Sequence, residues 1–293
     1  MNIAILSRNP GLYSTQSLAR AARLRHHYAR IIDYVNCDLI IEDGKLTISY
    51  QGQVLKDIDA IIPRIGASWT NFGAAVIRQF EHLNVFTSLS SDALIKARNK
   101  LSCSQILAAN GLQLPKTIVS NNSYLYKNLL KEIPGDQVVV KLINGTHGIG
   151  VVLADNKVQA ESILDAFNRA KQKSMMQEFI KESKGTDIRI FIVDGEIVGS
   201  MKRKAKEGEF RSNLHRGGTS SKIEITDNEK EVALKAAKSL GLTVAGVDML
   251  RSQRGPLVLE VNASPGLEGI ETTTKVDIAG RIINFVERNA KQA

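Results

Sequence analysis

The chain has 293 residues, of which 43% are hydrophobic, enough for a substantial core in one large α/β domain or in two to three small lobes. Its formal net charge of +9 would suit a polyanion, an acidic protein, a nucleotide or solubility alone, so charge does not choose among these. Aromatic residues make up only 5% and do not interleave with the basic ones, which disfavours a stacking surface for single-stranded nucleic acid.

The two cysteines favour a reducing compartment, and the hydropathy pattern does not predict a membrane segment. Cys37 and Cys103 show neither zinc-ligand nor disulfide spacing. The first residues, Met1–Leu6, lack a basic leader and predict a strand rather than a targeting segment. No apolar run approaches the roughly 20 residues of a membrane-spanning helix. We therefore expect a soluble, cytoplasmic protein with no membrane partner.

The first hundred residues alternate short β-rich runs with amphipathic stretches, which predicts an open α/β sheet. The expected strands are Asn2–Leu6, Ile31–Val35, Ala60–Pro63 and Val85–Thr87, with a small hairpin at Leu46–Tyr50 and Val54–Leu55. One expected helix begins at Ser14 or Ser17, and two others cover Asn71–Leu83 and Ala93–Ala109.

A strand-rich unit begins at Pro115 and is followed by two long hairpins. Its expected strands are Lys116–Val119, Gln137–Leu142 and Val151–Leu153, and its helices are Ser123–Lys131 and Val158–Ala170. The last third contains a hairpin folded at Asp194-Gly195, a basic loop, a helix opened by the capping box Thr226-x-x-Glu229, and a second hairpin.

The C-terminal hairpin carries the strongest candidate for a metal site. Its turn lies at Ser252–Gly255, and a turn centred on Arg254 would set Asp248 opposite Glu260. Because side chains alternate along a strand, Glu260 and Asn262 would share one face. Opposed carboxylates repel unless a cation lies between them, and oxygen ligands without nearby His or Cys suit Mg²⁺. The alternative is a solvent-facing hairpin with an acidic side.

A glycine-rich loop, Asn144–Val151, follows the strand that ends near Lys141. Its three glycines would let backbone N–H groups approach a phosphate and would let the loop act as a lid. It lacks the Gly-Lys-Ser/Thr of a Walker A loop and the Rossmann glycine pattern. Lys141 would neutralise phosphate charge, although a surface lysine beside a flexible turn fits the pattern equally well.

Arg203, on the second strand of the long hairpin, is expected to point inward. Alternation places it on one face with Ile197, Met201 and Ala205, and places the neighbouring lysines 202, 204 and 206 on a solvated face. A buried arginine needs an anion, and a transferring phosphoryl group or a substrate carboxylate would serve. The following loop, Phe210–Gly218, is rich in donors and glycines, so it is either functional or disordered.

The order of these residues resembles the ATP-grasp superfamily. The matching positions are Lys100, Lys141 with its glycine-rich loop, Gln177–Ile180, Asp187-x-Arg189, Arg203, Asn213, Asp248 and Glu260-x-Asn262. Within that superfamily, Ala205–Asn213, Gly246–Leu250 and Glu260–Glu268 closely resemble the RimK-type α-L-glutamate ligases, which add glutamates to the C-terminus of a small-subunit ribosomal protein. The similarity extends over nearly the whole chain.

The resemblance implies an α/β architecture of three parts. A pre-ATP-grasp open α/β domain would occupy residues 1–98, a central ATP-grasp lobe with the glycine-rich lid residues 99–173, and a C-terminal lobe with the metal site residues 174–293. ATP would bind between the last two parts.

The resemblance also implies roles for individual residues. Lys100 and Lys141 would contact phosphates, the backbone around Glu178 and Phe179 would receive adenine, and Asp187, Arg211, Ser212 and Asn213 would border the nucleotide. Asp248, Glu260 and Asn262 would hold two Mg²⁺ or Mn²⁺ ions, and Arg203 with Lys141 would stabilise charge on the reacting phosphoryl group. The chain departs from the family pattern at Asn99, where the family usually has Asp, at His147, where it has Gln, and around Leu89, where an asparagine is expected.

The implied activity is an ATP-dependent ligation that joins a carboxylate to an amine through an acylphosphate. The implied partners are L-glutamate and the C-terminal tail of a ribosomal protein, in a homo-oligomer that the family resemblance makes a tetramer, with no direct nucleic-acid binding required. Two other functions remain open. One is a ligase for a small-molecule amino acid or peptide acceptor, and the other is a nucleotide-gated module that binds ribosomes or RNA.

Overall fold

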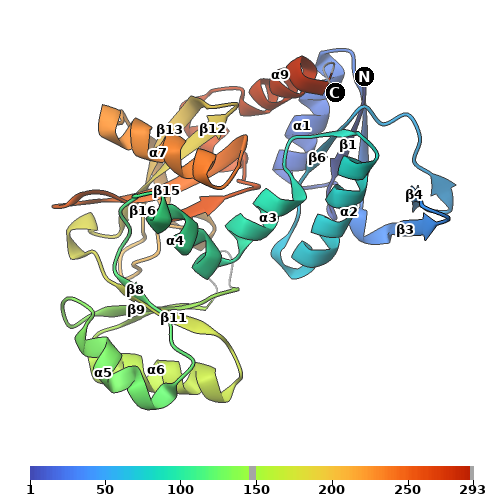
Figure 1. Cartoon of the computed structure of the whole chain (residues 1–293). Coiled ribbons are helices and arrows are strands. Elements are labelled where there is room, and N and C mark those ends of the chain that lie inside the picture. Colours follow the sequence, from blue (N-terminus) through green and yellow to red (C-terminus); the bar gives the residue numbers. More distant parts are fainter. Residues whose placement is uncertain (145–149, 291–293) are drawn as a thin grey trace.

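Three lobes organise the part of the chain that the computed structural model describes, residues 1–144 and 150–290 (Figure 1). The N-terminal lobe is built on a parallel sheet with strand order β2-β1-β6-β7. Its strands are β1 (Asn2–Leu6), β2 (Tyr28–Ile32), β6 (Ala60–Pro63) and β7 (Phe86–Thr87). Successive residues of β1 point to opposite faces, and helix α1 (Tyr13–Leu24) covers one face while α2 (Thr70–His82) covers the other. Both faces are therefore buried, as the uninterrupted apolar composition of these strands requires.

A small antiparallel sheet projects from the side of this lobe (Figure 1). It consists of β3 (Cys37–Glu42), β4 (Lys45–Tyr50) and β5 (Gln53–Val54). The β4–β5 hairpin was predicted, but β3 was not. The strand expected at Ile31–Val35 was wrong at its end, because β2 stops at Ile32 and the Asp33 side chain accepts a hydrogen bond from Val35 N at 3.2 Å to form a 3₁₀ turn.

Two other helix predictions need correction. Helix α1 begins at Tyr13 without a side-chain cap, and the hydroxyl of Ser14 instead accepts a hydrogen bond from Leu267 N at 2.9 Å. The helix expected over Ala93–Ala109 is two helices, α3 (Ser91–Arg98) and α4 (Lys100–Ala109). They separate at Asn99, whose ψ of 110° is extended and whose side chain caps α4. Asn is as good a cap as Asp, so this departure from the family pattern keeps the local structure.

The central lobe carries an antiparallel sheet with strand order β10-β9-β11-β8. Its strands are β8 (Thr117–Ile118), β9 (Val138–Leu142), β10 (Val151–Ala154) and β11 (Ser174–Glu178). Helices α5 (Tyr126–Lys131) and α6 (Lys157–Arg169) pack on it and close a core of its own. The helix expected at Ser123–Lys131 starts as a 3₁₀ turn, and β11 carries this sheet beyond residue 173. The predicted boundaries of the three parts, between residues 98 and 99 and between 173 and 174, stay a prediction.

The C-terminal lobe is an antiparallel sheet with strand order β14-β13-β12-β15-β16. Its strands are β12 (Thr186–Val193), β13 (Glu196–Lys204), β14 (Thr219–Lys222), β15 (Val244–Ser252) and β16 (Gly255–Asn262). Helix α7 (Asp227–Ser239), opened by the predicted capping box, covers one face, and α8 (Glu268–Thr274) and α9 (Ile278–Ala290) pack on the other side. Within the described residues, the 3₁₀ turns are Tyr34–Asn36, Ala67–Trp69, Ser123–Leu125, Lys181–Ser183 and Leu214–Arg216.

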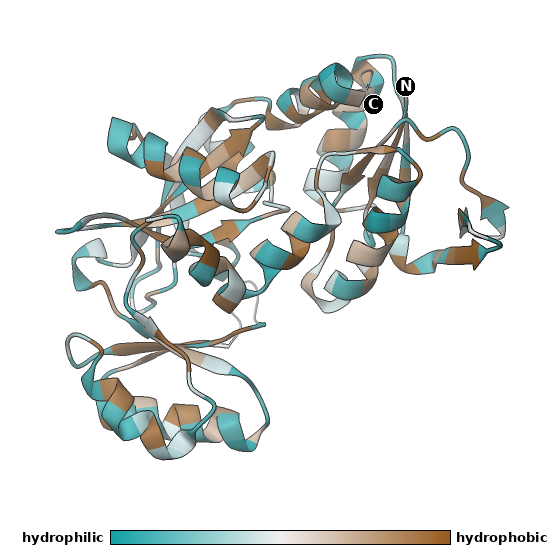
Figure 2. Cartoon of the chain, in the orientation of Figure 1, coloured by the Kyte–Doolittle hydropathy of each residue, from teal (hydrophilic) through white to brown (hydrophobic). Residues whose placement is uncertain are grey.

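The N- and C-terminal lobes share their cores, whereas the central lobe does not. One apolar cluster joins Phe80 of α2 to Val247 and Val261 of the C-terminal sheet, and a second joins Ile5 of β1 to Ile282 of α9. Figure 2 shows the hydrophobic strands of both lobes behind helices with polar outer faces. Of residues 1–144 and 150–290, no helix has the length and hydropathy to cross a membrane.

Candidate active site

One cleft lies between the central sheet and the C-terminal sheet, and it collects nearly all of the predicted site residues. Those that line it are Lys100, Lys141, Glu178, Phe179, Asp187, Arg203, Arg211, Ser212, Asn213, Asp248 and Glu260. The third predicted metal ligand, Asn262, does not line the cleft but hydrogen-bonds Glu260, which does. Residues that are up to 160 positions apart in the sequence, such as Lys100 and Glu260, therefore meet in one place.

The C-terminal sheet forms one wall of the cleft, called the C-terminal wall. Its strand register places the polar groups of this wall side by side. Asp187 of β12 pairs with Arg203 of β13, and Arg189 of β12 pairs with Asp248 of β15, which pairs in turn with Glu260 of β16. Directly opposed residues of an antiparallel pair have neighbouring side chains. The row of charges across the sheet therefore follows from backbone pairing alone.

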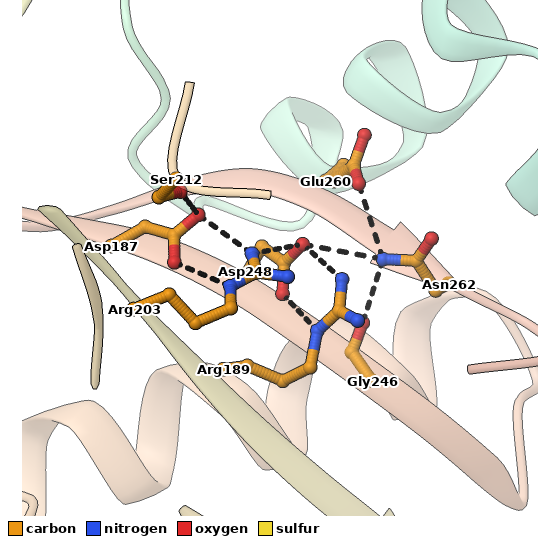
Figure 3. Close-up of polar contacts among 8 residues, drawn as sticks. All are labelled: Asp187, Arg189, Arg203, Ser212, Gly246, Asp248, Glu260 and Asn262. Atoms are coloured by element: carbon orange, nitrogen blue, oxygen red, sulfur yellow. Dashed lines mark hydrogen bonds and ion pairs between the residues drawn. The ribbon is translucent and has the colours of Figure 1, made fainter. Parts of the chain in front are cut away.

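These charges form a continuous network (Figure 3). Arg203 donates to both carboxylate oxygens of Asp187, at 2.7 and 2.6 Å, and lies 2.9 Å from Asp248 Oδ2. Arg189 donates to both oxygens of Asp248, at 2.6 and 2.5 Å. Ser212 Oγ donates to Asp187 Oδ2 at 2.6 Å. Burial alone would raise the pKa of Asp248, but Arg189 and Arg203 outweigh it and hold that pKa well below its usual range.

The inward orientation of Arg203 is confirmed, since the residue is 4% exposed. Its ion-pair partners among the described residues are Asp187 and Asp248, and its contact with a phosphoryl group or substrate carboxylate stays a prediction. One detail of that prediction was wrong. Ile197 does not share its face, because the β12–β13 pairing shifts by one residue beyond Phe191 and Ile197 packs into the opposite core.

The predicted apposition of Asp248 and Glu260 is confirmed, but the turn alone does not produce it. Ser252 pairs with Gly255, and continuing that register would set Leu259 opposite Asp248. An irregularity next to Met249 inserts one extra residue into β16, which brings Glu260 opposite Asp248 instead.

Asn262 lies at the centre of the three predicted metal ligands. Its amide nitrogen is 3.4 Å from Asp248 Oδ2, 3.3 Å from Glu260 Oε1 and 3.3 Å from the Gly246 carbonyl oxygen. No group of three or more His, Cys, Asp or Glu side chains suited to a metal occurs in the described ranges 1–144 and 150–290. A metal here would therefore be held by two carboxylates and an amide oxygen, a donor set that fits a hard cation such as Mg²⁺.

The opposite wall of the cleft carries Lys141. Lys141 is 9% exposed, and its ammonium donates to Gln177 Oε1 at 2.6 Å. Burial lowers its pKa to about 8, although Glu260 acts in the other direction. Burial also lowers the pKa of Lys100 at the start of α4. Lys141 thus faces the acidic side chains of the other wall, whereas the helix that carries Lys100 packs in the core shared with the C-terminal sheet.

The outer part of the cleft is apolar and aromatic. Phe179 and Phe210 meet edge to face with ring centroids 6.4 Å apart. Arg211 is held by both oxygens of Glu209 and donates to the Val151 carbonyl at 3.2 Å, which ties the loop after β13 to the central lobe. The loop expected to be either functional or disordered is therefore ordered at Arg211.

Comparison with family models decides the identity of this arrangement. Residues 1–94 match the model described as the RimK PreATP-grasp domain, and residues 97–286 match the RimK-like ATP-grasp domain. The chain belongs to the RimK-like ATP-grasp family. The predicted family and the predicted fold are both confirmed, and the membership makes the chain an ATP-dependent ligase.

Relatives of this family resemble the chain over almost its entire length. A probable alpha-L-glutamate ligase of Thioalkalivibrio sulfidiphilus is 51% identical over 291 residues, which is 99% of this chain and 97% of that protein. A protein of the same description from Vibrio cholerae is 50% identical over 290 residues, covering 99% and 96%.

Solved ATP-grasp structures share the fold at lower identity. The ligase PsnB complexed with minimal precursor superposes with a TM-score of 0.76 at 21% identity, covering 98% of both chains. A RimK domain ATP-grasp protein of Sphaerobacter thermophilus gives 0.74 at 18% identity, covering 97% of this chain and 99% of that one.

Three contributors to the RimK-like cleft were not among the predicted site residues. Arg189 holds Asp248, Gln177 holds Lys141, and Arg254 donates to Glu178 Oε2 at 2.7 Å. Gln177 had a signal in the sequence, because antiparallel pairing of β9 with β11 puts it diagonally across from Lys141. His147 and most of the glycine-rich loop, residues 145–149, lie outside the described residues.

Proposed function

We propose that this protein is an α-L-glutamate ligase that uses ATP to join L-glutamate to a peptide carboxylate, the C-terminus of a ribosomal protein. Relatives named probable alpha-L-glutamate ligases, about half identical over nearly the whole chain, support the reaction. The observation that carries the proposal is the cleft in which Lys100 and Lys141 face Asp248 and Glu260. Lysine cations and carboxylate oxygen ligands that line one cleft suit a nucleotide triphosphate with its metal.

The proposed roles follow the walls of the cleft. Lys100 and Lys141 bind phosphate oxygens, and Phe179 and Phe210 border the base beside the β11 backbone. Asp187, Ser212 and Asn213 border the nucleotide, with Arg211 held by Glu209.

Two Mg²⁺ or Mn²⁺ ions, which would neutralise charge on the phosphates, would be held by Asp248, Glu260 and Asn262. Asp248 Oδ1 accepts only from Arg189 Nε among the described residues, so this oxygen retains acceptor capacity. Arg203 keeps Asp248 and Asp187 ionised and oriented, and it stabilises charge on the reacting phosphoryl group.

The proposed chemistry has two displacements. A carboxylate oxygen attacks the γ-phosphorus of ATP, the bond from that phosphorus to the bridging oxygen of ADP breaks, and an acylphosphate forms. The amine of glutamate then attacks the acyl carbon, the carbon–oxygen bond to phosphate breaks, and the nitrogen loses a proton as the amide forms. Lys141 and Arg203 offset the charge that collects on the phosphoryl oxygens during the first displacement.

The net charge of +9 is compatible with an acidic peptide as the partner, because a basic surface attracts an acidic tail. The proposal includes the tetramer that the family resemblance implies and a cytoplasmic location.

The test is ADP release from the purified protein with Mg-ATP and glutamate, with and without peptides that end in glutamate, followed by mass spectrometry of the peptides. We expect glutamate-dependent ADP release and a ladder of added glutamates. ADP release with unmodified peptides would contradict the peptide acceptor and favour a small-molecule one. No turnover, together with salt-sensitive binding of RNA or ribosomes, would favour a nucleotide-gated binding module.

A further inference from the structure

Two arginines beside the cleft differ from the others near the site, because their hydrogen-bond partners are backbone carbonyls. Arg64, directly after β6, donates to the Pro265 carbonyl at 2.7 Å, and Arg98, the last residue of α3, donates to the Ile65 carbonyl at 2.7 Å. Within residues 1–144 and 150–290, neither guanidinium forms an ion pair with Asp or Glu. Each guanidinium has five N–H donors, so both retain unused donors.

Their surroundings make this arrangement costly. Burial, together with repulsion from Arg98, lowers the pKa of Arg64 to about 10. Burial also lowers the pKa of Arg98, with only partial compensation from Tyr34 and Glu260. Two neighbouring cations that are partly removed from water without a counterion disfavour the folded state, and an anion bound between them would reduce that cost.

The two arginines lie next to the metal-ligand side of the cleft. The Pro265 carbonyl that Arg64 holds belongs to the turn that follows Asn262, and Ser264 Oγ in the same turn donates to the Pro63 carbonyl at 3.3 Å. Pro265 also packs on Gly246, where an added Cβ would lie 2.7 Å from Pro265 Cβ, and the Gly246 carbonyl accepts from Asn262. Neither arginine lines the cleft assigned to the nucleotide.

We propose that Arg64 and Arg98 bind a carboxylate of a substrate other than ATP and hold it beside Glu260 and Asn262. The guanidinium fork matches a carboxylate in two parallel hydrogen bonds, which a lysine cannot do. The carboxylate belongs either to free glutamate or to the acidic end of the acceptor peptide. This inference rests on the proposed ligase activity, because it assigns a substrate group to the same site.

Steady-state kinetics test the proposal and separate the two sources. Arg64→Gln and Arg98→Gln are compared with Arg78→Gln, which removes an exposed arginine of α2 in the same lobe. Losing a charge-assisted hydrogen bond should raise KM for the bound substrate about 10- to 100-fold, with KM for ATP unchanged. A rise in KM for glutamate identifies the free amino acid, and a rise in KM for the peptide identifies its acidic end. Arg64→Lys should fall between the wild type and Arg64→Gln.

A binding measurement stands apart from turnover. Trp69 is the chain's only tryptophan and lies three residues after Gly66, with the Arg8 guanidinium 5.6 Å from the centre of its ring. We expect a saturable fluorescence change on adding L-glutamate or a peptide ending in glutamate, and little with L-glutamine or an amidated peptide ending in glutamine. The change should be lost in Arg64→Gln and Arg98→Gln and kept in Arg78→Gln.

The two measurements distinguish failure of this inference from failure of the ligase assignment. Binding that depends on Arg64 and Arg98 in a protein that ligates nothing would overturn the ligase and keep the carboxylate site. Unchanged KM values and unchanged fluorescence in folded Arg64→Gln and Arg98→Gln would overturn the carboxylate site and keep the ligase. If thermal unfolding shows that the Gln variants are unfolded, the Arg64→Lys kinetics decide, since a KM equal to wild type would overturn the proposal.

Discussion

The two walls of the cleft manage charge in opposite ways. On the C-terminal wall, Arg203 and Arg189 are paired with Asp187 and Asp248, so each of these four side chains has a counterion within 3 Å. On the central wall, Lys141 is just as buried but has the neutral Gln177 as its hydrogen-bond partner, and burial lowers its pKa to about 8.

This difference shows which wall has its charges neutralised in the absence of a ligand. The ion pairs of the C-terminal wall fix the position of Asp248, while the central wall holds a cation whose desolvation is offset only in part. Binding of a polyanion would offset the desolvation of Lys141 on the central wall and leave the ion pairs of the C-terminal wall unchanged. The cores agree with this division, because the central lobe has a separate core and the other two lobes share theirs.

Arg203→Met should break the paired wall and have the largest effect on stability. It leaves the carboxylate of Asp187 buried with Ser212 as its remaining side-chain donor, and loss of one partner of a buried pair costs about 3 to 5 kcal/mol. The free energy of unfolding in urea measures this loss. Lys202→Met, at the neighbouring exposed position, should change it little, and equal stability of the two variants would contradict the account of the paired wall.

Glu260→Gln should separate function from stability on the same wall. Glu260 forms no ion pair in the described part of the chain, so we expect wild-type urea unfolding but a fall in kcat for ADP release of about 100- to 1,000-fold. Glu196→Gln, an exposed position in the turn-side end of β13, is the control. Wild-type turnover of Glu260→Gln at low Mg²⁺ would rule out its role as a metal ligand.

On the central wall, Lys141→Met should weaken ATP binding without a loss of stability. Removing a desolvated cation should leave stability unchanged or raised, while KM for ATP should increase about 10-fold because a charge-assisted contact to phosphate is lost. Lys173→Met, an exposed lysine just before β11, should match the wild type in both measurements. A strong loss of stability in Lys141→Met would mean that Lys141 is paired in the free protein.

The smallest expected effect is a pH dependence that belongs to Lys141. Its folded pKa of about 8 lies below the ordinary value of 10.5, so between these values the unfolded chain binds more protons than the folded one. Stability of the ligand-free protein should therefore rise with pH across this window. The difference in unfolding free energy between wild type and Lys141→Met isolates the effect, and a difference that stays constant from pH 7.5 to 9.5 would refute it.

Much of the site was predictable because it depends on local pattern. Alternation and a turn signal predicted Glu260 and Asn262 on one face and Asp248 opposite Glu260, as the structure has them. The extra residue in β16, which makes that apposition possible, was not predictable, since no turn residue marks it. The similar shift in β13 moved Ile197 to the other face for the same reason. The strand β3 was missed because its outer residues are exposed and its pairing with β4 lies outside the main sheet.

The sequence by itself determined most of the order of helices and strands, the capping box at Thr226, the inward orientation of Arg203 and the family of the chain. These depend on neighbours within a few residues or on shared motifs. Only the tertiary structure decided which anions Arg203 meets, that Lys141 faces a neutral glutamine, and that Arg64 and Arg98 remain without carboxylate partners among the described residues. Each of these depends on which strands and lobes pack together, because an ion pair is a matter of distance in space and the sequence fixes distance only along the chain.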